Sequence, residues 1–520
     1  EYGAAWQALI WTMQGNLRFP PLADSYISTS ISATYAELIA LCYPTPEHLA
    51  LAKARSGDNP TGGAARTALF YREPAAPAAD AAGPARPTLP DIVFPFLSQG
   101  FLRLGEFGQS GLALLDASNW GGHHHRDSLN LYLWKDGYEL LSDLGYLWDH
   151  PDKGMTARTL AHNLVLIDGK GQKTKGRGGS FAFFALSPQL KAMSASSTAY
   201  DEATVYERTV VQVDHGDLGA YWLDLFRAQG GERRDYLFHG PNHNYVLEGA
   251  ACPSPDKDNP AAPRDTGANG PWKAVWKISD TYRFAAYSPG HPDETLLIAD
   301  EWGQRNHHNT DRGATLPYFF RRRTGAQVDA FVQVFAGFEE GRELVQSVKV
   351  TTPRDHAVIV EITHAGGRDI VLFGDGSRLE LTSVPVVSDG ILAVVAGLPA
   401  PGQAPTTTQP TALLLGGAEL QAPGVTLSNS RADWSGTIAA QVSQDGDSWF
   451  ELAGATLPTP EQFRGQALIV TGDDAISRAY PVLRAESTGQ GALKVYTRLS
   501  YQGFQARPAT TWRLYALAVK

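Results

Sequence analysis

From about residue 91, the chain consists of short apolar segments that each end in a turn. Segments such as GLALLDA (111–117), VYERTVVQV (205–213) and TALLLGG (411–417) have the length of strands, and turn sequences such as KDG and IDG separate them. No helical pattern of 10–15 residues interrupts this series, which disfavours βαβ units. The pattern therefore predicts stacked antiparallel sheets, and the 52 glycines and 33 prolines agree with a turn-rich β protein.

The N-terminal part carries a different pattern, with apolar residues at helical spacing. In residues 4–19 and 31–43 this spacing predicts one apolar face on each of two helices, formed by Trp6, Leu9, Ile10 and Met13 in the first and by Tyr35, Leu38, Ile39 and Cys42 in the second. Pro46 begins a further short helix. The Pro/Ala-rich stretch at 74–90 predicts an irregular linker, either a flexible hinge or a long surface loop.

Length and pattern together predict several domains in a mainly β chain of 520 residues. We expect an N-terminal α part with its linker at 1–90, a large antiparallel β-sandwich at 91–420 and a smaller C-terminal β module at 421–520. In that last module, the aromatic residues are expected to form core rather than a sugar-stacking platform; they are Trp434, Trp449, Tyr496 and Tyr501.

Composition excludes several classes of protein. The formal net charge is -10 and no long basic tract exists, so nucleic acid is not expected as a partner. No run approaches 18 apolar residues, so the sequence predicts no membrane span. Two cysteines, Cys42 and Cys252, cannot form a disulfide framework or a four-cysteine zinc site, and we expect both to be buried free thiols.

Ionisable side chains are densest in NWGGHHHRD, at 119–127. In an extended segment His123, His125 and Asp127 point to one face, because side chains alternate along a strand. Asp143 lies 18 residues past His125, and His162 lies 19 residues past Asp143. Two imidazoles and a carboxylate on neighbouring strands are a plausible ligand set for Zn²⁺. A hydrogen-bonded His/Asp network that organises the loop is the alternative.

Three motifs together resemble the heparinase II/III-like polysaccharide lyases. They are HHHRD at 123–127, LLSDLGY at 140–146 and TARTLAHNLVLIDG at 156–169. The similarity extends over about residues 95–340, where the chain also contains YERTVVQV, YWLDLFRAQGG and RRDYLFHG. The resemblance implies an (α/α) toroid followed by an antiparallel β-sandwich, with the helical segments at 1–70 as the end of the toroid.

The resemblance also implies roles for individual residues in the cleft. His123 takes the position of a histidine that faces the substrate and takes part in catalysis. Tyr146, which could line the cleft, and His239, near the site, are further candidate catalytic residues, with a buried structural histidine as the alternative for His239. Arg126 and Arg158 are expected to contact substrate carboxylates, with a solvated structural role as the alternative.

A zinc site is implied by the same resemblance. His125, Asp143 and His162 match the ligands of a structural zinc ion that holds two strands and the loop carrying His123. Asn163 and Asp127 match residues that orient this region.

The implied activity is β-elimination on a uronic-acid polysaccharide of the alginate or glycosaminoglycan type. Two alternatives stay open: a uronyl C5-epimerase of the same architecture, and a non-catalytic structural or surface protein. The resemblance also implies a tyrosine and an asparagine or histidine from the toroid that face the histidine of the sandwich. Only 122 residues precede His123, and these two residues are not identified among them. We therefore expect the chain alone to be inactive, with the rest of the toroid in a separate chain or missing. The resemblance implies a periplasmic or secreted protein.

Two further polar segments stand out. RNHHNTDRG at 305–313 gathers His307, His308 and Asp311, and it predicts a solvated loop over the sandwich, with a second metal or substrate loop as the alternative. RRR at 321–323 is expected to alternate on a strand edge, where one arginine is available for a polyanion.

Overall fold

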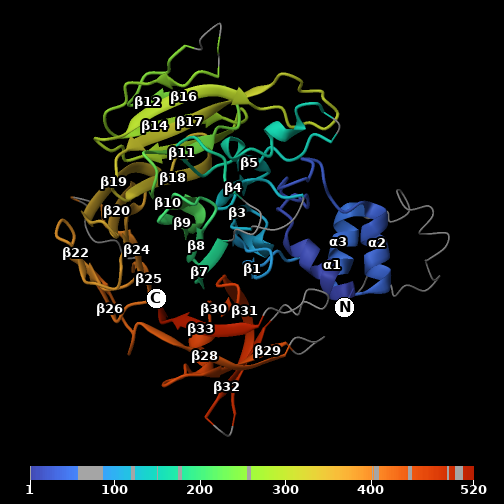
Figure 1. Cartoon of the computed structure of the whole chain (residues 1–520), viewed down its shortest axis with the longest axis vertical. Coiled ribbons are helices and arrows are strands. Elements are labelled where there is room, and N and C mark those ends of the chain that lie inside the picture. The colour runs from blue at the N-terminus through green and yellow to red at the C-terminus, as the bar shows by residue number, and fades with distance from the viewer. Residues whose placement is uncertain are drawn as a thin grey trace.

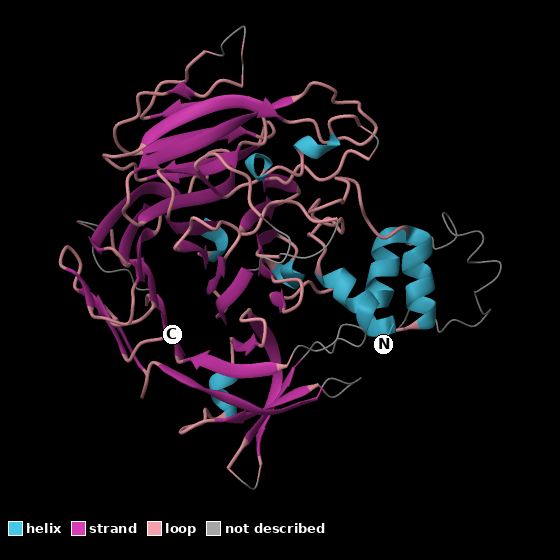
Figure 2. Cartoon of the chain, in the orientation of Figure 1, coloured by secondary structure: helices cyan, strands magenta, loops and turns pink. Residues whose placement is uncertain are grey.

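The fold is described from a computed structural model, and the description covers residues 2–56, 86–118, 123–148, 150–173, 179–254, 259, 261–400, 402, 409–442, 448–488, 491–497 and 508–520. Most of the predicted linker at 74–90, together with Tyr501, lies outside these residues. The structure is mainly β with an N-terminal α part, as the sequence predicts (Figure 2). Within the described residues, no helix is long and apolar enough to cross a membrane.

Three α-helices precede the strands: α1 (Tyr2–Trp11), α2 (Ala33–Cys42) and α3 (Pro46–Ser56). They lie to one side of the β part, next to β1 (Figure 1). The prediction of one helix over 4–19 is too long, because α1 ends at Trp11. Beyond it the chain approaches the sheet so closely that a Cβ at Gly15 would lie 1.9 Å from the Gln109 carbonyl oxygen, and Leu17 takes a positive φ of 60°.

The strands form five antiparallel sheets and one closed barrel. The first sheet follows chain order: β1 (Ile92–Phe94), β2 (Gln99–Leu104), β3 (Gly111–Asp116), β4 (Asn130–Lys135), β5 (Tyr138–Leu141). The eight-stranded second sheet has the order β12 (Tyr245–Glu248), β14 (Trp272–Lys277), β15 (Tyr282–Ser288), β18 (Asp329–Glu339), β10 (Ala220–Gln229), β9 (Val205–Asp214), β8 (Leu190–Ser197), β7 (Gly179–Leu186). The third sheet has the order β13 (Arg264–Asp265), β16 (Thr295–Trp302), β17 (Thr315–Thr324), β11 (Arg233–His239), β6 (Val165–Ile167).

The remaining strands lie nearer the C-terminus. The six-stranded fourth sheet has the order β19 (Val345–Arg354), β20 (Ala357–His364), β21 (Gly367–Phe373), β24 (Leu392–Leu398), β25 (Thr411–Leu415), β34 (Leu517–Val519). The fifth consists of β22 (Leu379–Leu381), β23 (Val386–Ser388), β26 (Glu419–Ala422) and β27 (Val425–Ser428). The barrel has the order β28 (Asp433–Val442), β29 (Trp449–Ala453), β32 (Leu493–Thr497), β31 (Ser477–Ser487), β30 (Ala467–Gly472), β33 (Ala509–Tyr515).

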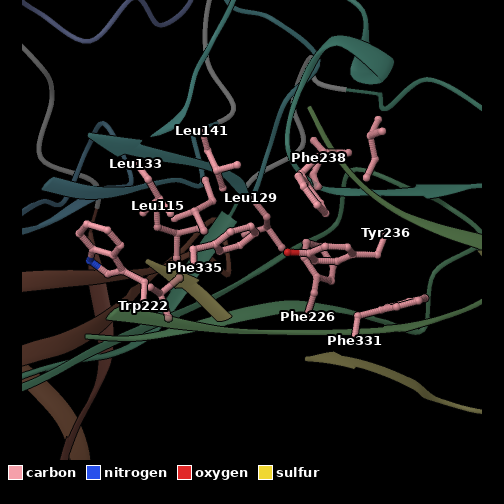
Figure 3. Packing of buried hydrophobic residues seen from close by; sticks show 14 of the residues in the cluster. Leu115, Leu129, Leu133, Leu141, Trp222, Phe226, Tyr236, Phe238, Phe331 and Phe335 are labelled. Carbon is pink, nitrogen blue, oxygen red and sulfur yellow. The ribbon is translucent and has the colours of Figure 1, made fainter. Parts of the chain in front are cut away.

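The eight-stranded sheet is at the centre of this stack, with a separate core on each of its faces. One face packs against the first and third sheets through a core rich in aromatic residues, including Trp222, Phe226 and Tyr236 (Figure 3). The other face packs against the six-stranded sheet, which in turn covers the four-stranded one. The region expected to be one sandwich is thus a stack of sheets, because alternating side chains give each inner sheet two apolar faces.

The helical part is anchored to the first sheet by a buried arginine. Arg103 on β2 is 1% exposed, and its guanidinium donates to the carbonyl oxygens of Met13 (2.6 Å) and Trp11 (2.5 Å). Burial lowers the pKa of Arg103 to about 9, although the charge of Asp91 opposes this shift. The end of α1 is therefore fixed against β2, and this contact directs the following loop toward the sheet.

Several local expectations are wrong. Cys42 and Cys252 are free but exposed, because Cys42 ends α2 and Cys252 lies in a loop after β12. Tyr35 is 59% exposed, since α2 buries its Ala36/Ile39 face instead. The arginines at 321–323 lie on β17, inside a sheet between β16 and β11, rather than on an edge. Each of the three forms an ion pair, two with Glu294 and one with Asp235.

Candidate functional site

Three chain segments meet where the first and third sheets adjoin. One is the loop from His123 to Ser128 between β3 and β4, the second follows β5, and the third precedes β6. Asn163 ties them together: its amide nitrogen donates to the carbonyl oxygens of Leu131 (3.1 Å) and Ser142 (3.0 Å). Its side-chain oxygen accepts from the backbone N–H of His239 (3.1 Å). Asn163 thus links these segments by hydrogen bonds, and its role in orienting the site stays a prediction.

His125, Asp143 and His162 come together as the sequence predicts. All three are buried, and their candidate ligand atoms lie within 4.8 Å of one another. His162 Nδ1 is 2.9 Å from Asp143 Oδ2, and the Gly145 N–H donates to Asp143 Oδ1 at 3.0 Å. Burial acts to raise the pKa of Asp143, but the neighbouring histidines outweigh it and lower the pKa to about 2. The carboxylate is therefore ionised, as a metal ligand must be.

Unpaired buried atoms test whether a metal fits this group. Both ring nitrogens of His125, Nε2 of His162 and both carboxylate oxygens of Asp127 are buried without a hydrogen-bond partner. Leaving such atoms unpaired costs about 1–3 kcal/mol each. Two imidazoles and an ionised carboxylate are a normal donor set for Zn²⁺, so the residues fit that ion. The carboxylate of Asp127 makes no hydrogen bond within the described structure, so its predicted orienting role is not seen.

A second group with similar side chains is fully satisfied by hydrogen bonds. His215, His364 and Asp369 also lie within metal-binding distance of one another. The Gly366 N–H donates to His364 Nδ1 at 3.1 Å, which leaves the ring proton on Nε2 facing Asp369 Oδ1 at 3.0 Å. The Asp369 carboxylate also accepts from Tyr221 at 2.7 Å. This group fits a hydrogen-bonded network rather than a metal site, because a protonated nitrogen is not a ligand.

His123 lies on the exposed side of the zinc-type group. Its side chain is 90% exposed, and Nδ1 lies 2.7 Å from Asp24 Oδ2, on a residue 99 positions earlier. Because a carboxylate accepts hydrogen bonds, Nδ1 carries the proton and Nε2 keeps its lone pair. Asp24 Oδ1 is also 3.6 Å from His125 Nε2. The sequence gives no indication of Asp24, because nothing in PPLADS distinguishes it from an ordinary loop.

Arg126 and Arg158 are both on the surface of the site. The Arg126 N–H donates to the Ala157 carbonyl oxygen at 3.2 Å, which brings the loops that carry the two arginines together. Both side chains are exposed. Within the part of the chain that the structure describes, neither guanidinium forms an ion pair with a carboxylate. The exposed guanidinium groups of Arg126 and Arg158 therefore lie on adjoining loops, one of which carries His123.

Aromatic rings border the same site. Tyr146 is half-buried and its N–H donates to the Ser25 carbonyl oxygen at 3.0 Å. Tyr26 stacks on His307 with ring centroids 4.0 Å apart, and Tyr146 lies 6.2 Å from Tyr26. Nothing in the sequence around Tyr26 distinguishes it from an ordinary loop residue, and only the tertiary structure brings it to the site.

The loop at 305–313 braces the site rather than forming a second metal site. Arg305 donates to Glu139 (2.7 Å) and to the carbonyl oxygen of Asp143 (2.7 Å). Asp311 accepts from the backbone N–H groups of Arg305 and Asn306, so it shapes the loop. Among the described residues, Asp311 does not join His307 and His308 in a metal-binding group.

His239 lies beneath the site instead of facing the substrate. Its side chain is fully buried, burial lowers its pKa to about 3, and its ring lies 5.1 Å from that of Tyr318. His239 thus has the burial expected of the alternative, a structural histidine.

Comparisons with known proteins agree with this architecture. Residues 89–287 match the family model described as heparinase II/III-like, C-terminal. Among solved structures, heparan sulfate lyase HepC from Pedobacter heparinus is similar at 14% identity and a TM-score of 0.51, over 71% of this chain and 52% of that one. A heparinase III structure gives 13% identity and a TM-score of 0.51, with 71% and 53% covered.

The chain spans about half the length of these solved structures. At this identity, the likeness establishes a shared fold. A search of the curated proteins finds no match. Over residues 89–287, the chain is therefore similar to the C-terminal domain of the heparinase II/III-like family, as its motifs predict.

Proposed function

We propose that this protein is a polysaccharide lyase that cleaves a uronic-acid polysaccharide, of the alginate or glycosaminoglycan type, by β-elimination. One observation carries the proposal: an exposed histidine, His123, lies 2.7 Å from Asp24 and shares its loop with Arg126, and that loop adjoins the one carrying Arg158. The two solved structures named above are a heparan sulfate lyase and a heparinase III, which supports the reaction class.

The proposed reaction needs a base, a charge partner and an acid. His123 Nε2 takes the proton from C5 of the uronate, and the C–H electron pair forms the C4–C5 double bond as the C4–O bond breaks. Arg126 and Arg158 hold the carboxylate, so that the added negative charge at C5 is tolerated. Tyr146, whose hydroxyl lies 3.5 Å from Lys153 Nζ, gives its proton to the departing oxygen.

A zinc ion belongs to this proposal as a structural element. His125, Asp143 and His162 would hold it, and it would supply a fixed positive centre that pins the loop carrying His123. Proton transfer stays with His123 and Tyr146.

The activity test uses the full chain with alginate and with heparan sulfate. Although the sequence by itself predicts an inactive chain, the residues gathered around His123 lead us to expect the ultraviolet absorbance of an unsaturated uronate to rise with at least one polymer. His123→Ala should abolish the rise without changing the melting temperature. Activity of the chain alone would contradict the expectation of an incomplete site. Asp24 and Tyr26, from the loop between α1 and α2, already contribute side chains to this site.

Two results would contradict the lyase proposal. Solvent deuterium at C5 without chain shortening identifies an epimerase. If neither polymer gives product or deuterium exchange, even after a separate chain carrying the toroid is added, a non-catalytic protein is favoured.

A periplasmic or secreted location remains a prediction from the family resemblance.

A further inference from the structure

Trp148 is unusual for an exposed residue. Its side chain is 64% exposed, and its backbone has a positive φ of 41°. An exposed indole gains nothing from burial, and an L-residue in the left-handed region is strained. Two unfavourable features at one position point to a role outside the stability of the fold.

The backbone around Trp148 is firmly held, so the exposed ring is presented rather than loose. Leu147 is fully buried, and its carbonyl oxygen accepts from the His150 N–H at 2.9 Å. On the other side, the Tyr146 N–H donates to Ser25 at 3.0 Å. The segment is therefore tied to the loop at Ser25 two residues before the indole, and Leu147 is packed in the interior.

Trp148 is the first of a series of aromatic rings in contact, which includes rings from two other loops. Trp148 meets Tyr146 edge to face at 6.3 Å, Tyr146 lies nearly parallel to Tyr26 at 6.2 Å, and Tyr26 stacks on His307 at 4.0 Å. We call Trp148, Tyr146 and Tyr26 the aromatic row. Flat rings of this kind match the apolar C–H faces of pyranose sugars.

Positive charge borders the aromatic row. Lys153 Nζ lies 5.8 Å from the centre of the Tyr146 ring and is exposed. Asp24, Ser25 and Tyr26 are consecutive. Asp24 contacts His123, whereas Ser25 accepts a hydrogen bond from Tyr146 and Tyr26 belongs to the aromatic row. The row thus borders the proposed catalytic histidine, and the nearby cations complement an acidic sugar rather than a neutral one.

We infer that the aromatic row is a binding subsite that stacks against pyranose rings of an acidic polysaccharide next to His123. This inference rests on the proposed function for its substrate class. Trp148 supplies the largest exposed apolar surface of the subsite, and Lys153 pairs with a carboxylate or sulfate of the bound sugar.

Binding is tested without turnover, in the full chain carrying His123→Ala. Calorimetry with alginate and heparan sulfate hexasaccharides measures the Kd before and after Trp148→Ala. We expect at least one hexasaccharide to bind and Trp148→Ala to raise its Kd about tenfold, because ring stacking is lost. Trp148→Phe should keep most of the affinity. Trp449→Ala, in the barrel where Lys494 covers the ring at 4.1 Å, is the matched control and should leave the Kd unchanged.

Three outcomes would overturn the inference: an unchanged Kd in Trp148→Ala, equal binding of neutral dextran, or no binding of either hexasaccharide. Production of unsaturated uronate by the unmutated chain is measured separately. A failed subsite with intact product formation is thereby distinguished from failure of the lyase proposal.

Discussion

Asp24 and His123 form the residue pair on which the proposed chemistry most depends. The carboxylate oxygen lies 2.7 Å from His123 Nδ1, which fixes the ring and leaves Nε2 to accept a proton. We expect Asp24→Asn to lower kcat by about ten- to a hundredfold with little change in KM, since positioned proton transfer contributes roughly 10²–10⁴-fold in total.

Steady-state kinetics with the susceptible polymer provide the measurement for Asp24. Asp152→Asn, at an exposed aspartate in the loop between β5 and β6, is the control and should leave kcat unchanged. Equal kcat values for Asp24→Asn and the unmutated protein would remove Asp24 from the mechanism.

Substitution of a single residue, His162, tests the zinc proposal. The residue is fully buried and lies 2.9 Å from Asp143. His162→Ala leaves that carboxylate buried without its partner, so we expect loss of bound zinc and a destabilisation of about 3–5 kcal/mol. Metal analysis and thermal unfolding measure both effects. His123→Ala, at an exposed position, should change neither, and zinc retained in full by His162→Ala would contradict the ligand assignment.

At the scale of elements, the network around Asp369 joins two sheets. His215 lies in the turn between β9 and β10 of the eight-stranded sheet, whereas Asp369 and His364 lie on β21 and β20 of the six-stranded sheet. Burial raises the pKa of Asp369, but its hydrogen bonds to both histidines lower it by more. Burial lowers the pKa of His215, but Asp369 raises it by more.

These two shifts define a pH window for stability. The depressed pKa of Asp369 gives stability that is present above its unfolded value of 3.8 and is lost as the pH falls through the folded value. The raised pKa of His215 gives stability that is present below 6.5 and is lost as the pH rises. The network should therefore contribute most between these values.

Asp369→Asn should destabilise the protein by about 3–5 kcal/mol near pH 5.5, and by less near pH 3 and pH 8. Urea unfolding at the three pH values provides the free energies. Asp375→Asn removes an exposed ion pair with Arg354 and should cost less than about 1 kcal/mol. A cost for Asp369→Asn that does not vary with pH would contradict the assignment.

At the scale of the whole molecule, the last strand connects the barrel to the central stack. β34 follows the barrel strand β33 and pairs with β25, where Leu517 lies opposite Leu415. The barrel also contacts β7 through the bond from the Leu186 N–H to the Gly465 carbonyl oxygen at 2.6 Å. The C-terminal part is thus integrated into the fold rather than suspended from it (Figure 1).

Deletion of residues 517–520 should lower the melting temperature and increase light scattering on heating, because it exposes the edge of β25. Deletion of residues 429–520 should have a larger effect, since it also uncovers the contact with β7. Differential scanning calorimetry with scattering detection measures both. An unchanged melting temperature in the shorter deletion would mean that β34 adds no stability.

The expected strands and helices follow from local patterns, which is why they agree well with the structure. Turn-separated apolar segments predict antiparallel strands at positions such as β3 and β9, and helical spacing predicts α2 and α3. Helix faces and ends are less well predicted: Tyr35 is exposed and α1 stops at Trp11, because contacts with other elements decide burial. The extent of the stack, with five sheets in place of one sandwich, depends on packing between distant strands.

The sequence by itself determined the family motifs and the set of His125, Asp143 and His162, because their residue types and order are local and distinctive. Only the tertiary structure decided that Asp24 and Tyr26 meet this site, since contacts across 99 positions leave no periodic pattern in a sequence. It also separated two chemically similar groups. His125 keeps unpaired buried nitrogens, whereas Asp369 is surrounded by donors, and hydrogen-bond satisfaction is a property of three-dimensional neighbours.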